Sequence, residues 1–239
     1  MKKYFEYYMD DEIKQRILDF YENVDTNMNT VQTSRKTKIK LEKILSEVSL
    51  DKKDVVLDVG CSRGELLKCI HAQIAEGIGI DLSSNIIDIN NKENDLDNIR
   101  YEVFDGEHIN LPEQVDKICL LDVLEHAFNP EVLIKSIYEN LREGGILALQ
   151  VPSTGWLSEL VFGKYHMGHL RYYDPDSIKS FLEKNNFKIQ SIQVYNAVPG
   201  GVFMLKRGAE LYQFMDKLCN FIPPKIYPYF GSILVICRK

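Results

Sequence analysis

The sequence predicts an α/β fold, in which a mostly parallel β-sheet carries helices on both of its faces. Short apolar runs of strand length alternate from Val55 onward with segments of helical periodicity. A tight, glycine-containing turn follows the first of these runs. Two later helices are expected to begin at a proline that directly follows Asn129 or Asp174.

Length and composition indicate one domain with a small appendage. The chain has 239 residues, of which 45% are hydrophobic and 27% are charged, the balance of an ordinary globular protein. The net charge is −6 and the basic residues are dispersed, which disfavours nucleic acid as a partner because counterion release needs a concentrated basic face. The start lacks the apolar stretch of a signal peptide, and no run is long enough to span a bilayer. We therefore expect a cytoplasmic protein without stable membrane insertion.

Two amphipathic helices are expected ahead of the first strand. Apolar residues recur at helical spacing from Ile13 to Tyr21 and from Leu41 to Val48, with a polar stretch between them. We expect residues 1–50 to form an N-terminal helical cap on a main domain that comprises residues 51–198 and 231–239.

The expected strands are short apolar runs, each followed by a polar or glycine-containing turn. Right-handed crossovers place the carboxyl ends of parallel strands on one edge of their sheet. The runs are VVLDV (55–59), GIGI (77–80), YEVF (101–104), KICLL (117–121), ILALQV (146–151) and the final SILVICRK (232–239).

Residues 199–230 interrupt the alternation with an insertion that is rich in Phe and Tyr. Additional core and an extra helix on the sheet edge are possible structures for it. A cap over a substrate cleft is the third, because amphipathic aromatic side chains suit the wall of a binding site.

The turn in VVLDVGCSRGELL has the features of a nucleotide-type site. The strand brings Asp58 to the sheet edge, and Gly60 and Gly64 allow a tight turn and close approach of a ligand to the backbone. The dinucleotide fingerprint GxGxxG is not met, because Ser62 and Glu65 occupy its second and third glycine positions. A pyrophosphate ligand, and with it a nicotinamide-dependent dehydrogenase, is therefore disfavoured.

The next strand ends in GIGIDLSS, which places Asp81 at the same edge of the sheet. A carboxylate there can accept hydrogen bonds from both hydroxyls of a ribose. Capping of the following helix is the alternative role, although Ser83 and Ser84 are also available as caps.

Together these motifs resemble those of class I S-adenosylmethionine-dependent methyltransferases. The first motif of that family has an acidic residue two places before GxGxG, and here Ser62 replaces the middle glycine. KICLLDVLEHAFNP resembles the fourth motif of the subfamily with the ubiquinone-biosynthesis O-methyltransferases, with Asp122, Glu125 and His126 matching its DVLEH. LREGGILALQVP resembles the following motif, except that Glu143 stands where proline is common.

The resemblance implies a Rossmann-like fold with a seven-stranded sheet, and S-adenosylmethionine as cofactor with S-adenosylhomocysteine as product. It places the methionine part of the cofactor at the first turn and the adenine amino group at Asp105-Gly106, where a simple turn is an equal alternative. The (D/N)PPY motif of enzymes that methylate base nitrogens is absent. The cofactor-binding residues implied are Asp58, Gly60, Cys61, Ser62, Gly64, Asp81, Leu82, Asp105, Gly106, Leu121 and Asp122.

The segment GKYHMGHLRYYDPDS is expected on the acceptor side of the cleft. The resemblance implies a substrate loop here, with His166, Arg171 and Tyr172 as substrate-binding residues. A hydroxyl acceptor needs a base, and histidine has a suitable pKa, so His169 and then His126 are the catalytic candidates, each with a structural role as alternative. The HxxH pair has no evident third ligand, so no metal site is expected.

The function expected is methyl transfer from S-adenosylmethionine to a small-molecule acceptor. The acceptor atom expected is a hydroxyl of a sugar, a lipid-linked intermediate or a natural product. The alternatives are N- or C-methylation of a small molecule, and a non-catalytic cofactor-binding or assembly protein on the same fold. The motifs predict no particular oligomeric state.

Overall fold

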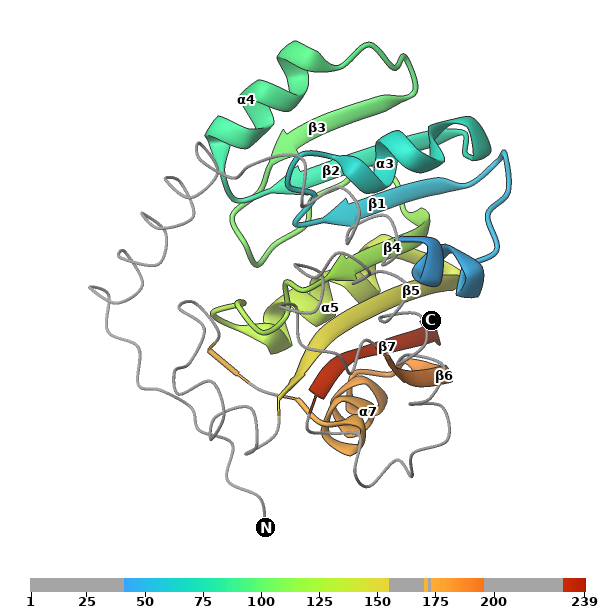
Figure 1. Cartoon of the computed structure of the whole chain (residues 1–239), viewed down its shortest axis with the longest axis vertical. Coiled ribbons are helices and arrows are strands. Elements are labelled where there is room, and N and C mark those ends of the chain that lie inside the picture. Colours follow the sequence, from blue (N-terminus) through green and yellow to red (C-terminus); the bar gives the residue numbers. More distant parts are fainter. Residues whose placement is uncertain (1–40, 155–169, 172, 196–229) are drawn as a thin grey trace, which may run out of the picture.

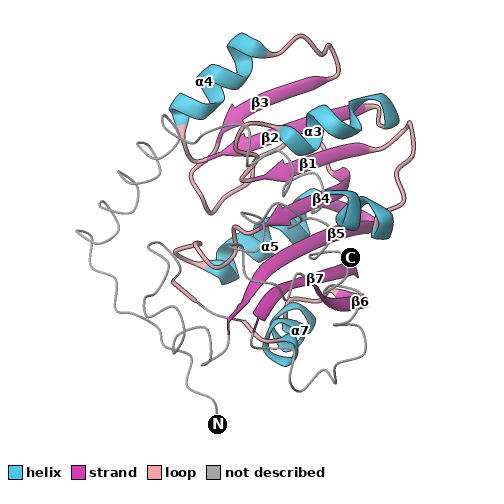
Figure 2. Cartoon of the chain, in the orientation of Figure 1, coloured by secondary structure: helices cyan, strands magenta, loops and turns pink. Residues whose placement is uncertain are grey.

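The computed structural model describes residues 41–154, 170–171, 173–195 and 230–239. Figures 1 and 2 show a twisted sheet with helices on both sides. Its strands are β1 (Val55–Val59), β2 (Glu76–Asp81), β3 (Ile99–Val103), β4 (Val115–Leu121), β5 (Leu141–Thr154), β6 (Lys188–Tyr195) and β7 (Phe230–Arg238). The helices are residues 41–47, α3 (Glu65–Ile70), the 3-10 turn η1 (His71–Gln73), α4 (Ser84–Glu93), α5 (Pro130–Asn140) and α7 (Pro175–Lys184).

The seven strands lie in the order β3-β2-β1-β4-β5-β7-β6, which Figure 1 shows from top to bottom. Strands β1 to β5 are mutually parallel, and β7 is antiparallel to both of its neighbours, β5 and β6. The expected mostly parallel, seven-stranded sheet is therefore confirmed.

Each face of the sheet is covered by its own hydrophobic cluster. On one face, residues 41–47, α3 and α4 pack against alternate positions of the strands, represented by Ile44, Leu67 and Ile87. On the other face, α5 and α7 pack through residues such as Ile134 and Leu182. The central strands read as continuous apolar runs because they are buried on both faces.

The order of the strands reverses at β1 and β4. The chain leaves β1 toward α3 on one face and leaves β4 toward α5 on the other face. Adjacent strands whose connections diverge in this way leave a crevice at their carboxyl ends.

Both expected helix starts are confirmed. The Asn129 side chain accepts a hydrogen bond from the Val132 amide at the start of α5. At α7, Asp174 and Ser177 form a reciprocal capping box, and Pro175 occupies the first turn.

Several strands differ in extent from the expected runs, and one strand was not expected. Strand β5 begins at Leu141 and ends at Thr154, whereas the expected run was 146–151. Strand β3 begins at Ile99 and ends at Val103, so that Phe104 lies beyond the sheet. Strand β6 was not among the expected runs, because Ile189, Ile192 and Val194 are separated by polar residues and are only half-buried at the sheet edge.

Parts of the expected domain organisation lie outside the described residues. These parts are residues 1–40 of the helical cap and residues 199–229 of the insertion, so the division into cap, main domain and insertion stays a prediction. In the portion of the chain that the structure describes, no helix combines the length and apolar character needed to cross a membrane.

A nearly buried ion pair joins the amino-terminal ends of the central strands. Lys117 on β4 donates from Nζ to Oδ2 of Asp54, and both side chains are about one-tenth exposed. The Asp54 backbone carbonyl also accepts hydrogen bonds from the amides of Ala75, just before β2, and of Glu76, the first residue of β2. Asp54 thus links β1, β2 and β4 at the edge opposite to the crevice.

We predict that Lys117→Met lowers the free energy of unfolding by about 3 kcal/mol, because it leaves a buried carboxylate without its cation. Urea unfolding measures the change. The matched control is Lys135→Met on α5, which breaks an exposed pair with Glu139 and should cost less than about 0.5 kcal/mol. Equal changes in the free energy of unfolding for the two substitutions would show that the buried pair adds no more stability than an exposed one.

Candidate functional site

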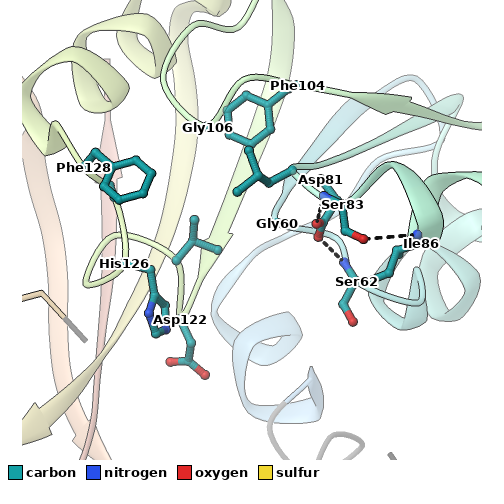
Figure 3. Close-up of a pocket in the computed structure, with 13 residues that line it drawn as sticks. Gly60, Ser62, Asp81, Ser83, Ile86, Phe104, Gly106, Asp122, His126 and Phe128 are labelled. Atoms are coloured by element: carbon teal, nitrogen blue, oxygen red, sulfur yellow. Dashed lines mark hydrogen bonds between the residues drawn. The ribbon is translucent and has the colours of Figure 1, made fainter. Parts of the chain in front are cut away.

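A cavity of about 260 Å³ lies at the carboxyl ends of β1 to β4, where the crevice is expected (Figure 3). Its walls come from the ends of all four strands and from the start of α4. The lining residues are Gly60, Ser62, Asp81, Leu82, Ser83, Ile86, Phe104, Gly106, Asp122, Val123, His126, Ala127 and Phe128.

The turn after β1, residues 60–64 (the β1 turn), has three backbone positions in the left-handed region. Gly60 has φ 73°, Ser62 has φ 46° and Gly64 has φ 71°. A Cβ at Gly60 would collide with the Val123 side chain. Ser62 adopts the conformation at a cost of about 1 kcal/mol, which a glycine would avoid.

Asp81 connects the end of β2 to the β1 turn. Its Oδ2 accepts a hydrogen bond from the Ser62 amide at 2.9 Å, and its Oδ1 accepts one from the Ser83 amide at 3.0 Å (Figure 3). Each carboxylate oxygen can accept a second hydrogen bond. The side chain therefore holds the turn in place and keeps capacity for a ligand in the cavity.

The start of α4 uses a different residue as its cap. The Ser83 Oγ accepts a hydrogen bond from the Ile86 amide at 3.3 Å (Figure 3). The N-cap residue of α4 is therefore Ser83, and not Asp81, for which capping was the alternative role.

Asp105 and Gly106 form a turn beside the cavity. The Asp105 Oδ1 accepts hydrogen bonds from the Glu107 and His108 amides, and His108 Nδ1 lies 2.9 Å from Oδ2. Partial burial acts to raise the pKa of the Asp105 carboxyl, but these hydrogen bonds outweigh it and hold the pKa below its usual value. Gly106, with φ 88°, lines the cavity, whereas the Asp105 side chain is exposed and engaged in the turn.

Some of the residues expected to bind cofactor lie behind the cavity wall. Cys61 is buried, and burial, with the nearby Asp58 and Asp81 carboxylates, raises the pKa of its thiol, which therefore stays protonated and unreactive. Asp58 is buried in β1. Neither these two residues nor Gly64 and Leu121 line the cavity.

Asp122 follows β4 in a left-handed conformation, with φ 58°. Its Oδ1 accepts a hydrogen bond from Nε2 of the buried Gln150 at 2.7 Å, and its amide donates to the Gln150 carbonyl. Gln150 was not predicted as a functional residue. The one available sign was an amide side chain in the otherwise apolar run ILALQV.

The loop after β4, residues 122–129 (the β4 loop), forms the opposite wall. His126 and the ring of Phe128 face the cavity across from Asp81 (Figure 3). His126 Nε2 lies 3.7 Å from Oε1 of Glu125, whose side chain is buried. The lining residues that the sequence did not reveal are Ser83, Ile86, Phe104, Val123, Ala127 and Phe128.

Arg171 lies against the β4 loop. Its guanidinium donates to the carbonyl oxygens of Ala127 and Phe128, the second at 2.9 Å. The other acceptor-side predictions, His166, His169 and Tyr172, lie outside the described residues.

The cavity fits S-adenosylmethionine in three respects. Gly60 and Ser62 of the β1 turn line the cavity. Asp81 has acceptor capacity for ribose hydroxyls. The apolar surfaces of Leu82, Ile86 and Phe104 form a wall that suits a flat heterocycle.

Comparisons with known proteins agree with this assignment. A profile of the family described as a methyltransferase domain matches residues 32–192. A malonyl-[acyl-carrier protein] O-methyltransferase from Marinomonas sp. is 25% identical over 167 residues, which cover 66% of this chain and 62% of that protein. A ubiquinone biosynthesis O-methyltransferase from Coxiella burnetii is 33% identical over 112 residues, 46% of this chain and 47% of that protein.

The chain therefore spans only about half to three fifths of the length of these two relatives. A solved S-adenosylmethionine-dependent methyltransferase from Mesorhizobium loti superposes with a TM-score of 0.61 over 83% of this chain and 96% of that chain, at 15% identity, a likeness of fold. The profile match covers most of the chain and includes β1 to β5. The chain thus belongs to the S-adenosylmethionine-dependent methyltransferases, and S-adenosylmethionine is its cofactor.

Proposed function

We propose that this methyltransferase acts on an oxygen atom of a small molecule, a hydroxyl of a sugar, a lipid-linked intermediate or a natural product. The observation that carries the proposal is the placement of His126 in the same cavity as the β1 turn and Asp81. A proton acceptor and the cofactor site thereby share one cavity. The names of both relatives, which are O-methyltransferases, favour oxygen as the acceptor atom.

The β1 turn and Asp81 form the cofactor side of the cavity in this proposal. Asp81 accepts the ribose hydroxyls, and Leu82, Phe104 and Gly106 enclose the adenine. The remaining residues implied by the family resemblance support this side: Asp58, Cys61, Ser62, Gly64, Asp105, Leu121 and Asp122.

Methyl transfer from a sulfonium is an in-line displacement, in which the acceptor oxygen forms its bond to carbon as the carbon–sulfur bond breaks. When bound, the cofactor supplies the activated methyl group. The protein aligns the acceptor, excludes water and takes up the proton that the hydroxyl loses. An imidazole nitrogen of His126 receives this proton.

Glu125 supports that role of His126. A carboxylate beside an imidazole stabilises the imidazolium that forms when the ring takes a proton. The pair is in place, with 3.7 Å between His126 Nε2 and Glu125 Oε1. His169 remains the other candidate base, and His166 and Tyr172 remain predicted acceptor contacts.

The β4 loop favours an acceptor with an apolar or aromatic part. Val123, Ala127 and Phe128 offer it hydrocarbon surface, while His126 offers one polar group. The aromatic insertion at 199–230 would add to this wall if it forms the substrate cap, which is one of the three structures that its sequence allows. We also propose a cytoplasmic location for the enzyme.

The test is transfer of a labelled methyl group from S-adenosylmethionine to a panel of phenols, catechols, sugars, amines and carbon acids. Formation of an O-methyl product supports the proposal. An N- or C-methyl product would replace it with the corresponding alternative. Cofactor binding without transfer to any acceptor, in the panel or in a cell extract, would favour a binding or assembly protein.

We predict that Asp81→Asn weakens the binding of S-adenosylhomocysteine by about 1.5 to 3 kcal/mol, which is roughly 10- to 100-fold in affinity, because one charged acceptor is lost. Isothermal titration measures the affinity. Asp88→Asn, on the exposed face of α4, is the matched control and should leave it unchanged. Unchanged affinity in folded Asp81→Asn would remove the ribose assignment.

We predict that His126→Ala lowers kcat about 100-fold or more while the affinity for S-adenosylhomocysteine stays within about twofold, as expected for loss of a general base. The pH dependence of residual turnover should lose its lower limb, which reports the protonation of the base. His71→Ala, outside the cavity on η1, is the control. A parallel fall in cofactor affinity and melting temperature would instead assign His126 a structural role.

A further inference from the structure

We propose that Arg171 is a positioning residue, which sets the acceptor wall of the cavity by holding the β4 loop from outside. The inference depends on the proposed function in one respect: the proposed function is what assigns the acceptor to this wall. Arg171 lies 44 and 43 residues along the chain from Ala127 and Phe128, whose carbonyl oxygens accept hydrogen bonds from Nη1 and Nη2.

A third hydrogen bond extends the same contact. The Leu170 amide donates to the Glu125 carbonyl at 2.8 Å. Residues 170 and 171 therefore bind three of the four carbonyl groups between positions 125 and 128. These same positions carry His126 and Phe128, which line the cavity.

The β4 loop depends on such support because its own turn is short. The His126 amide donates to the Val123 carbonyl at 2.9 Å, and the Ala127 amide donates to the Leu124 carbonyl at 3.3 Å. Carbonyl groups in a partly buried loop need partners, and an unsatisfied one costs about 1 to 3 kcal/mol. Arg171 satisfies two adjacent carbonyls at once.

The geometry suits a guanidinium and not an ammonium. Two carbonyls of consecutive residues are matched by the two terminal nitrogens of a planar, rigid fork, whereas lysine presents a single nitrogen on a flexible stem. The family resemblance implied that Arg171 binds the acceptor. Its two terminal nitrogens, which would be needed to pair with a carboxylate of an acceptor, instead bind the carbonyl oxygens of Ala127 and Phe128. This contact favours a positioning role over direct binding of the acceptor.

The functional consequence follows from the position of the loop. A displacement of about 1 Å between an acceptor and a reacting methyl can reduce turnover about 100-fold. Loosening of the β4 loop would displace both His126 and Phe128, while the β1 turn and Asp81 on the opposite wall keep their own contacts. Arg171 thus acts on the acceptor side and not on cofactor binding.

The test compares Arg171→Met, Arg171→Lys and the control Arg142→Met. The control breaks a pair with Asp116 at the start of β4, far from the cavity edge. Three readouts need no acceptor: hydrogen exchange of the amides at 126–128, the ¹⁹F resonance of Phe128 in protein labelled with 4-fluorophenylalanine, and titration with S-adenosylhomocysteine. Phe128→Leu assigns the resonance.

In Arg171→Met we expect exchange at 126 and 127 to rise at least tenfold and the Phe128 resonance to shift or broaden. Affinity for S-adenosylhomocysteine should stay within twofold. Arg171→Lys should resemble Arg171→Met, and the control should resemble the unaltered chain. All of this holds whether or not any acceptor is methylated, so a failure of the proposed function would not be mistaken for a failure of this inference.

Three results would overturn the role. Unchanged exchange and an unchanged Phe128 resonance in folded Arg171→Met would show that the loop holds itself. Full recovery of both readouts by Arg171→Lys would show that a positive charge is enough to hold the loop and that the planar guanidinium is not needed. A loss of S-adenosylhomocysteine affinity as large as that of Asp81→Asn would move Arg171 to the cofactor side.

Discussion

The reversal of strand order at β1 and β4 is the constraint from which the site follows. Parallel strands with right-handed crossovers end on one edge, and only where the connections diverge to opposite faces does that edge open. Here α3 covers one face and α5 the other, so none of the helices in the described part of the chain fills the space between the two strand ends. The cavity is thus a property of topology, and its lining residues are whichever residues follow the strands.

Within that opening, Asp81 joins two segments of the cavity wall. Its two oxygens accept hydrogen bonds from the β1 turn and from the start of α4, two segments that belong to different strand–helix units. The left-handed Ser62 is held at one end of this link. A strained backbone persists where surrounding contacts determine it, and such positions cluster at binding sites. The same carboxylate that holds the turn is therefore suited to meet a ligand there.

The sequence predicted the parts of the structure that local chemistry decides. The glycine turn after β1, the caps at Asn129 and Asp174, and the apolar central strands all carry their information within a few residues. Strand β6 was less evident, because an edge strand with one wet face lacks a continuous apolar run. Most of the predicted cap (1–50) and insertion (199–230), namely residues 1–40 and 199–229, lies outside the described part of the chain.

The sequence could not predict contacts between residues that lie far apart along the chain. Gln150 beneath Asp122, Lys117 on Asp54, and Arg171 on the β4 loop each join segments at least 28 residues apart, and no periodicity marks such pairs. These contacts also differ in what they support. The β1 turn is held by Asp81 at the end of the neighbouring strand, whereas the β4 loop is held by Arg171 from a segment that follows β5. The two sides of the cavity therefore depend on separate sets of contacts, the Asp81 hydrogen bonds on one side and the Arg171 hydrogen bonds on the other.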